Sequence, residues 1–189
     1  MRQDDSLRIV LLSLFCTMST ETTLDWRSRL DAGRSYRLTL ILAPPGSVWE
    51  ARLRRWQESL ERPVARFVLT AADNAPACFL QTLIEALSGL CPAVRRVDRD
   101  QPLDAGLVEV LNALLTLPDD VVLIVERYEI ITAPDVHAAV ARMLDYLPPQ
   151  VRLVLVSREI PPLPNLPRLR ARRQLWEVRG ENCTLHGES

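Results

Sequence analysis

The residues best placed to do chemistry stand in one eight-residue turn. It reads Ala43, Pro44, Pro45, Gly46, Ser47, Val48, Trp49 and Glu50. An apolar, β-rich run at 37–43 enters the turn, and a helical period of apolar residues at 49–60 leaves it. A glycine turn between a strand and a helix can wrap phosphate groups in backbone N–H groups, and its nucleotide-binding form reads G-x-x-x-x-G-K-[ST]. The chemistry to test for is therefore nucleotide binding.

The last three positions of the turn oppose that chemistry. Val48 is a β-branched residue where the motif has a permissive glycine. Trp49 replaces the lysine that would reach the phosphate oxygens, and Glu50 places a negative charge at the helix N-terminus, where an anion would otherwise be stabilised. The sequence predicts a vestigial phosphate loop that binds no nucleotide.

The composition excludes further kinds of chemistry. All 23 basic residues of the 189-residue chain are arginine. The chain therefore has no lysine that could form a Schiff base or contact a nucleotide phosphate. The four cysteines show no paired spacing and only two histidines are present, which predicts no metal site. A formal net charge of -1 gives no long-range attraction to nucleic acid or to an anionic membrane.

The rest of the pattern describes the scaffold that would position the turn. Apolar runs predict strands at 37–43, 64–70, 121–125, 151–156 and 174–178. Helical periods predict helices at 49–60, 76–87, 107–117 and 134–147. We expect Asp73 and Asn74 to offer the cap of the second helix, and the four prolines within 160–169 to hold an extended loop. Alternating strands and helices predict an α/β fold, with a mainly parallel five-stranded sheet covered on both faces.

Collinear motifs extend well beyond the turn. Residues 43–56 fit the pattern A-P-A-G-Y-G-K-T-T-L-L-x-x-W without a gap and end on the same tryptophan. Residues 123–132 are similar to L-V-L-D-D-Y-H-x-I-T, 153–163 to L-V-L-x-S-R-x-x-P-P-L, and 169–177 to L-R-A-R-x-Q-L-x-E. In these motifs, over about 24–178, the chain resembles the nucleotide-binding domain of MalT-like, LuxR-type transcriptional activators of the STAND class. The resemblance implies a three-layer P-loop NTPase-like domain whose Walker B strand is central.

The resemblance also assigns roles to three residues outside the turn. The family's Walker B acidic pair falls on Glu126 and Arg127, and its γ-phosphate-sensing arginine falls on Arg158. Glu126 could still reach a metal, whereas Arg127 cannot act as a base. We therefore expect a vestigial Walker B motif, no catalytic residue, no metal and no cofactor. ATP and magnesium would be bound only under the alternative of an ATP-binding switch, given below.

Three functions stay open, of which we favour the first. It is a non-catalytic regulatory or interaction module derived from a MalT-like regulator, with a protein partner for which a homologous full-length regulator is the candidate. The second is a switch that binds ATP without hydrolysing it, and the third is a remnant of a split regulator gene. The family's winged helix, helical repeats and DNA-binding helix-turn-helix do not follow the match. We expect no direct DNA binding, no membrane contact and a cytoplasmic location.

Domain limits and the remaining polar or aromatic features have plain interpretations. We expect an N-terminal extension at 1–23 for which no fixed structure is required, a degenerate domain at 24–179 and a tail at 180–189. The helical spacing of Trp49 and Trp56 predicts core positions, and His137 lies beside a buried stripe with a structural role. A basic run predicts a solvated face or an interdomain contact, and its members are Arg168, Arg170, Arg172 and Arg173.

Overall fold

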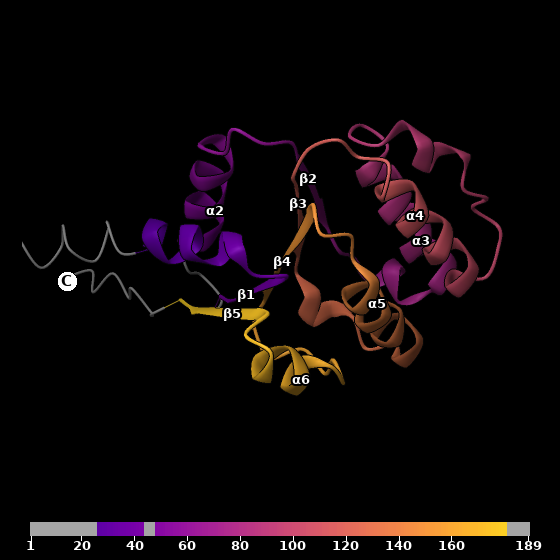
Figure 1. The fold of residues 1–189 in the computed structure, drawn as a ribbon. Coiled ribbons are helices and arrows are strands. Elements are labelled where there is room, and N and C mark those ends of the chain that lie inside the picture. The colour runs from indigo at the N-terminus through magenta and orange to yellow at the C-terminus, as the bar shows by residue number, and fades with distance from the viewer. Residues whose placement is uncertain (1–25, 44–47, 181–189) are drawn as a thin grey trace, which may run out of the picture.

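A five-stranded parallel sheet forms the centre of the chain (Figure 1). The computed structural model describes residues 26–43 and 48–180. The sheet order is β2-β3-β4-β1-β5, and all four neighbouring pairs are parallel. This confirms the predicted α/β class and sheet. The strands are β1 (Leu38–Leu42), β2 (Val64–Val68), β3 (Val121–Glu126), β4 (Val151–Ser157) and β5 (Leu175–Arg179).

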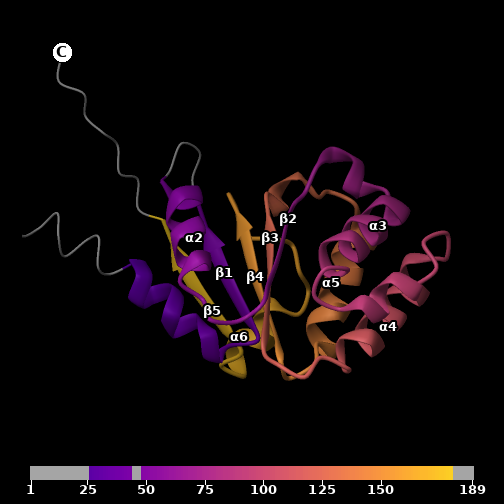
Figure 2. The ribbon, with the colours of Figure 1, turned by 90° about the horizontal axis from the view of Figure 1, so that it is seen from above.

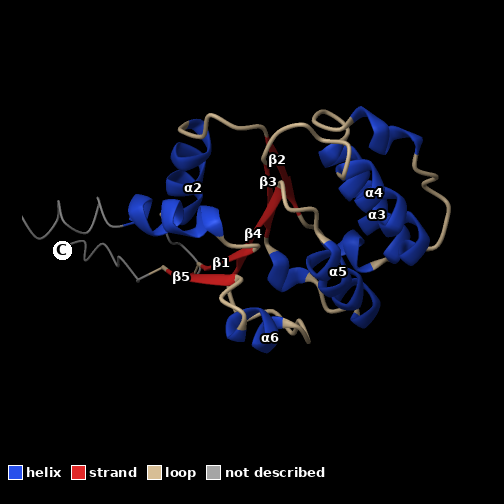
Figure 3. Cartoon of the chain, in the orientation of Figure 1, coloured by secondary structure: helices blue, strands red, loops and turns tan. Residues whose placement is uncertain are grey.

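Helices cover both faces of the sheet, as the strand–helix alternation predicts. Figure 2, seen from above, places α2 on one side of the strands and α3, α4 and α5 on the other. The helices are α2 (Trp49–Glu58), α3 (Pro76–Leu87), α4 (Leu103–Leu114), α5 (Pro134–Tyr146) and α6 (Leu166–Ala171), and 26–32 is also helical. Short helical turns lie between these elements, and they are η1 (Gly33–Ser35), η2 (Ala71–Asn74), η3 (Pro92–Arg96) and η4 (Tyr128–Ile130). Figure 3, coloured by secondary structure, shows the strands between the helices of the two faces.

Each face of the sheet has its own core, and strand alternation decides which side chains enter it. The larger core joins the sheet to α3, α4, α5 and α6, with Leu123 and Leu153 contributed by the strands. The smaller core joins the sheet to α2, with Ile124 and Val154 contributed by the same two strands. Adjacent residues of one strand therefore serve opposite cores.

The position of β3 in the sheet differs from the prediction. The middle strand is β4, which lies between β3 and β1, so β3 is second from one edge. All six residues of β3 are nevertheless buried, because β2 and β4 flank it and helices cover both faces. A continuous apolar run indicates an interior strand and does not distinguish the second position from the third.

The prediction of an extended loop over 160–169 was wrong in its second half. Helix α6 begins at Leu166, with Pro167 in its first turn. Proline is tolerated there because the first N–H groups of a helix have no partner within the helix. Leu166 and Leu169 are buried and join the larger core, which fixes this short helix against the sheet.

The segment before α3 is capped differently from the prediction. Ala75 is the N-cap of α3 and supplies no side-chain cap. Asp73 instead closes a capping box with Thr70 around η2, and it accepts a hydrogen bond from the Thr82 hydroxyl at 2.6 Å. Asn74 accepts bonds from the backbone N–H groups of 132 and 133 at 2.7 and 3.0 Å. Asp73 therefore joins η2 to the side of α3, and Asn74 joins η2 to the loop before α5.

Helix α4 begins one turn before the predicted position. Gly106 lies in that turn, where its lack of a side chain interrupts the apolar period. A Cβ atom at this position would lie 2.4 Å from Cδ2 of Leu80, so the glycine allows α4 to approach α3 closely.

Candidate functional site

The candidate site lies at the carboxyl edge of the sheet, where ligands of open α/β folds bind. Strands β1, β4 and β3 are neighbours and end there at Leu42, Ser157 and Glu126. The backbone N–H of Ala43 donates to the carbonyl of Ser157 at 2.8 Å, which joins the start of the vestigial loop to the end of β4. Pro44, Pro45, Gly46 and Ser47 lie outside the described residues.

Trp49 begins α2 and is buried in the smaller core, as predicted for a core position. It packs with Leu53 and Trp56 on the inner face of the helix, and it is only 4% exposed. Gly180 lies directly against the indole, since a Cβ atom there would meet Trp49 Nε1 at 1.9 Å. The N–H of Gly180 donates to the carbonyl of Leu42 at 2.8 Å. The indole therefore fixes the chain ends of β1 and β5 beside the start of α2.

Among the described residues, the side chains at the start of α2 offer no positive charge to an anion. Val48 is the N-cap residue of this helix and makes no side-chain capping bond. Val48 is 44% exposed, and Glu50 is exposed in the first helical turn. A carboxylate at this end of a helix is favourable for the helix dipole and unfavourable for a second anion.

Glu126, the last residue of β3, is buried and paired with Arg66 of β2. The side chain of Glu126 is 7% exposed and that of Arg66 is 24% exposed, and Nε of Arg66 donates to Oε1 of Glu126. Both side chains face α2, because Ala65 and Phe67 on either side of Arg66 enter the opposite core. The bond to Glu126 raises the pKa of Arg66 above its ordinary value, and the charge of Glu50 raises it further.

Sequence reasoning missed Arg66, although a signal was present. An arginine in the apolar strand 64–68 that shares a face with apolar residues needs an acidic partner on a neighbouring strand. Glu126 ends β3, the strand that pairs with β2 in the described sheet, but this pairing follows from the sheet order and not from the pattern of either strand. The Glu126 carboxylate, which by its length could still have reached a metal, is therefore paired with this arginine.

Arg127 adopts a left-handed backbone conformation and points away from the core. Its φ is 60°, and its side chain is exposed. Within the described parts of the chain, its guanidinium makes no hydrogen bond or ion pair. A non-glycine residue in this region is uncommon and costs about 1 kcal/mol or more, which the surrounding turn η4 must offset.

Arg158 follows β4 and is held against η4. Its Nε lies 3.2 Å from Oε1 of Glu129, and its backbone N–H donates to Oε2 of the same carboxylate at 3.3 Å. The Arg158 side chain is 56% exposed, whereas that of Glu129 is 14% exposed. The structure therefore brings Arg158 to the same edge as Glu126 and gives its guanidinium an internal partner.

His137 is a buried structural residue of α5, in keeping with the prediction. Its Nδ1 lies 3.0 Å from the hydroxyl of Tyr128, which is fully buried. Burial raises the pKa of the Tyr128 hydroxyl and lowers the pKa of the His137 imidazole. Both groups are therefore neutral near pH 7, and the pair joins η4 to α5.

Metal and membrane features are absent from the residues that the structure describes. No group of three or more His, Cys, Asp or Glu side chains in 26–43 and 48–180 could hold a metal ion. In the same residues no helix has the length and apolar content to cross a membrane. Cys78 and Cys91 are free thiols, and Cys16 and Cys183 lie outside the described residues.

The chain is similar in sequence to bacterial transcriptional regulators. It is 27% identical over 158 residues to the HTH-type transcriptional regulator MalT of Cronobacter sakazakii, and 28% identical over 158 residues to that of Serratia proteamaculans. Each match covers 80% of this chain and 17% of the regulator, so the chain spans about a sixth of the length of these relatives. No family model matches the chain. The MalT-like resemblance seen in the motifs is confirmed.

Solved structures of P-loop NTPases share the fold. The crystal structure of Cdc6p from Pyrobaculum aerophilum matches with a TM-score of 0.54 at 15% identity, over 82% of this chain and 44% of that one. A chain of the Drosophila ORC bound to AT-rich DNA and Cdc6 matches with a TM-score of 0.51 at 13% identity, over 95% of this chain and 61% of that one. At these identities the likeness establishes the P-loop NTPase-like fold alone.

Proposed function

We propose that this chain is a regulatory module of the MalT type that neither binds nor hydrolyses a nucleotide. The observation that carries the proposal is the buried pair of Arg66 and Glu126. Glu126 holds the position of the acidic residue that would face magnesium in the related domains, and its carboxylate is already neutralised inside the protein. The relatives are named as transcriptional regulators, which supports a regulatory role.

The Arg66 guanidinium opposes magnesium binding for an electrostatic reason. Magnesium is held by carboxylate oxygens and water in near-ideal octahedral geometry, so it needs a carboxylate that is open to the ion. Here the Arg66 guanidinium is bonded to the Glu126 carboxylate, and a divalent cation would have to displace it. Separating a buried ion pair costs about 3 to 5 kcal/mol, a hundredfold or more in affinity.

Trp49 opposes phosphate binding for a steric reason. The Trp49 indole is buried and lies against Gly180. Because tryptophan stands where the motif has lysine, the cation of the motif is also missing. Moving a buried aromatic side chain into water would cost about 2 to 3 kcal/mol. Glu50, exposed in the first turn of α2, would add charge repulsion to that cost.

Thermal unfolding with and without nucleotide tests this part of the proposal. We expect no rise in melting temperature with millimolar ATP, ADP or GTP in the presence of magnesium, measured against magnesium alone. A nucleotide at 100 times its dissociation constant would stabilise the native state by about 2.7 kcal/mol. A reproducible rise that depends on the nucleotide would favour the alternative of a switch that binds ATP without hydrolysis.

We further propose that the module acts through an intact MalT-type regulator in the same cell. The family resemblance implies assembly through nucleotide-binding domains, and a domain with the same outer surface could enter that assembly without completing it. The module would then reduce the amount of active regulator by mass action. Its own net charge of -1 gives no support for direct DNA contact.

Affinity purification of a tagged copy from the native host tests this second part. We expect mass spectrometry to identify a MalT-type regulator among the retained proteins, and deletion of the gene to raise transcription of that regulator's targets. An untagged strain is the control. If no such regulator is retained and transcription does not change, the remnant-gene alternative is the better account.

A further inference from the structure

A pocket at the amino edge of the sheet is lined by three arginines. Arg37 immediately precedes β1, and Arg168 and Arg172 lie in and just after α6. With Asp145 near the end of α5 and Gln174 before β5, they surround a volume of about 240 Å³. The pocket lies at the opposite ends of the strands from the vestigial loop. At about 3.3 Å per residue, the five residues of β1 place the two edges roughly 17 Å apart.

The pocket has more positive charge than its acidic residue can balance. Asp145 is the one carboxylate among its lining residues. Burial lowers the pKa of the Arg37 guanidinium, the charges of Arg152 and Arg168 lower it further, and Asp145 opposes them. Like charges held close together in a partly buried site repel, and an anion between them relieves the repulsion.

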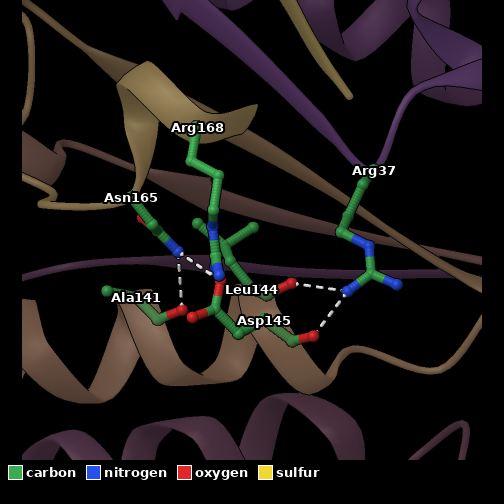
Figure 4. A network of polar contacts seen from close by, with 6 residues as sticks. All are labelled: Arg37, Ala141, Leu144, Asp145, Asn165 and Arg168. Atoms are coloured by element: carbon green, nitrogen blue, oxygen red, sulfur yellow. Dashed lines mark hydrogen bonds and ion pairs between the residues drawn. The ribbon is translucent and has the colours of Figure 1, made fainter. Parts of the chain in front are cut away.

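Hydrogen bonds hold Arg37 and Arg168 in place, and those of Arg37 leave some of its donors unused (Figure 4). Nη1 of Arg37 donates to the carbonyls of Leu144 and Asp145, at 2.8 Å each, at the C-terminal end of α5. Arg168 and Nδ2 of Asn165 both contact Oδ1 of Asp145, the latter at 2.9 Å. The remaining N–H groups of Arg37 are not used by any residue of 26–43 and 48–180.

Arg172 lines the pocket and has no partner for its charge among the described residues. Within the part of the chain that the structure describes, its guanidinium makes no hydrogen bond or ion pair. Its neighbour Arg170, by contrast, is bonded to Glu177 at 2.7 Å and does not line the pocket. A guanidinium presents a planar fork of donors that matches carboxylate and phosphate oxygens.

We propose that this pocket binds a compact oxyanion, the phosphate or polycarboxylate group of a small molecule. Arg37 and Arg172 supply positive charge that Asp145 does not balance, because Asp145 is already paired with Arg168. Arg37 is already oriented by α5, so little conformational entropy is lost on binding. The volume is below that of sites for drug-sized ligands, which restricts the ligand to a small one. The site does not depend on the proposed function, because it shares no residue with the vestigial loop or with the pair of Arg66 and Glu126.

Isothermal titration of the full chain with inorganic phosphate and, separately, with citrate tests the proposal. Sodium chloride at equal ionic strength is the control for charge screening. We expect saturable binding of at least one of the two anions, and the better ligand identifies a phosphate or a polycarboxylate as the natural group. The substitution Arg172→Gln should weaken that binding about tenfold, the loss of one charge-assisted contact.

Arg170→Gln is the matched control, since it removes a nearby arginine, in α6, that does not line the pocket. Without anion, Arg172→Gln should change the melting temperature by less than about 2 °C, because the side chain is exposed and unbonded within the described residues. Absence of saturable binding for both anions overturns the proposal. Equal weakening by the two substitutions also overturns it, because it would indicate unspecific attraction to net charge.

Discussion

Replacing Arg66 by methionine should destabilise the protein far more than an ordinary surface substitution. Methionine keeps the apolar stem and removes the guanidinium, which leaves the Glu126 carboxylate, 7% exposed, without its partner. Breaking a buried pair from one side costs about 3 to 5 kcal/mol, and the 24% exposure of Arg66 places this pair at about 3 kcal/mol. For a chain of this length, that corresponds to a fall in melting temperature of about 6 to 12 °C.

Urea unfolding followed by tryptophan fluorescence measures the effect, since Trp49 and Trp56 are buried in the core next to the pair. With a slope of about 2 kcal/mol/M, the loss appears as a midpoint lowered by about 1.5 M. Arg62→Met is the matched control. Arg62 forms a more exposed pair with Asp120, at 3.3 Å, and its replacement should cost less than about 1 kcal/mol.

A double substitution separates an unpaired charge from lost packing. Adding Glu126→Gln to Arg66→Met replaces the isolated charge by a neutral amide, so the double variant should be more stable than Arg66→Met alone. If Arg66→Met is no more harmful than Arg62→Met, the pair is not a buried one and the electrostatic argument against magnesium fails. If the double variant shows no recovery, the loss is one of packing alone.

Three further predictions test other parts of the structure. Burial lowers the pKa of His137 in the folded protein below its pKa in the unfolded chain. The folded state therefore loses stability as the pH falls from the unfolded pKa toward the folded one. The free energy of unfolding, measured with urea between pH 7 and 5, should depend less on pH in His137→Asn. Gly180→Ala should lower stability by about 1 to 3 kcal/mol through its clash with Trp49, whereas Gly89→Ala, with open space around it, should be near neutral in the same melts. Removal of residues 1–17, which precede the family match, should leave the melting temperature nearly unchanged, and loss of folded protein would show that this segment packs on the domain.

Buried strands were predictable because burial on two faces leaves a continuous apolar run, as at 121–125. The order of the strands was not predictable, because a continuous apolar run indicates only that a strand has a neighbour on each side. The middle strand is in fact β4 and not β3. Helix α6 was missed because its prolines were read as interrupting a helix, although Pro167 lies in the first turn. The replacements at Trp49 and Glu50 are visible in sequence. The pairing of Arg66 with Glu126 required the sheet.

The strand order has a consequence for the timing of folding. Val122 pairs with Val64 on one side and Arg152 on the other, whereas Leu38 pairs only with Leu153 and Leu175, much further along the chain. During synthesis from the N-terminus, β1 is made first and yet has no neighbour until β4 and β5 exist. Distant pairings form late because closing a long loop is costly. In pulse-labelling hydrogen exchange, the amides of β2 and β3 should therefore become protected before those of β1, the earliest strand made and the last to be enclosed.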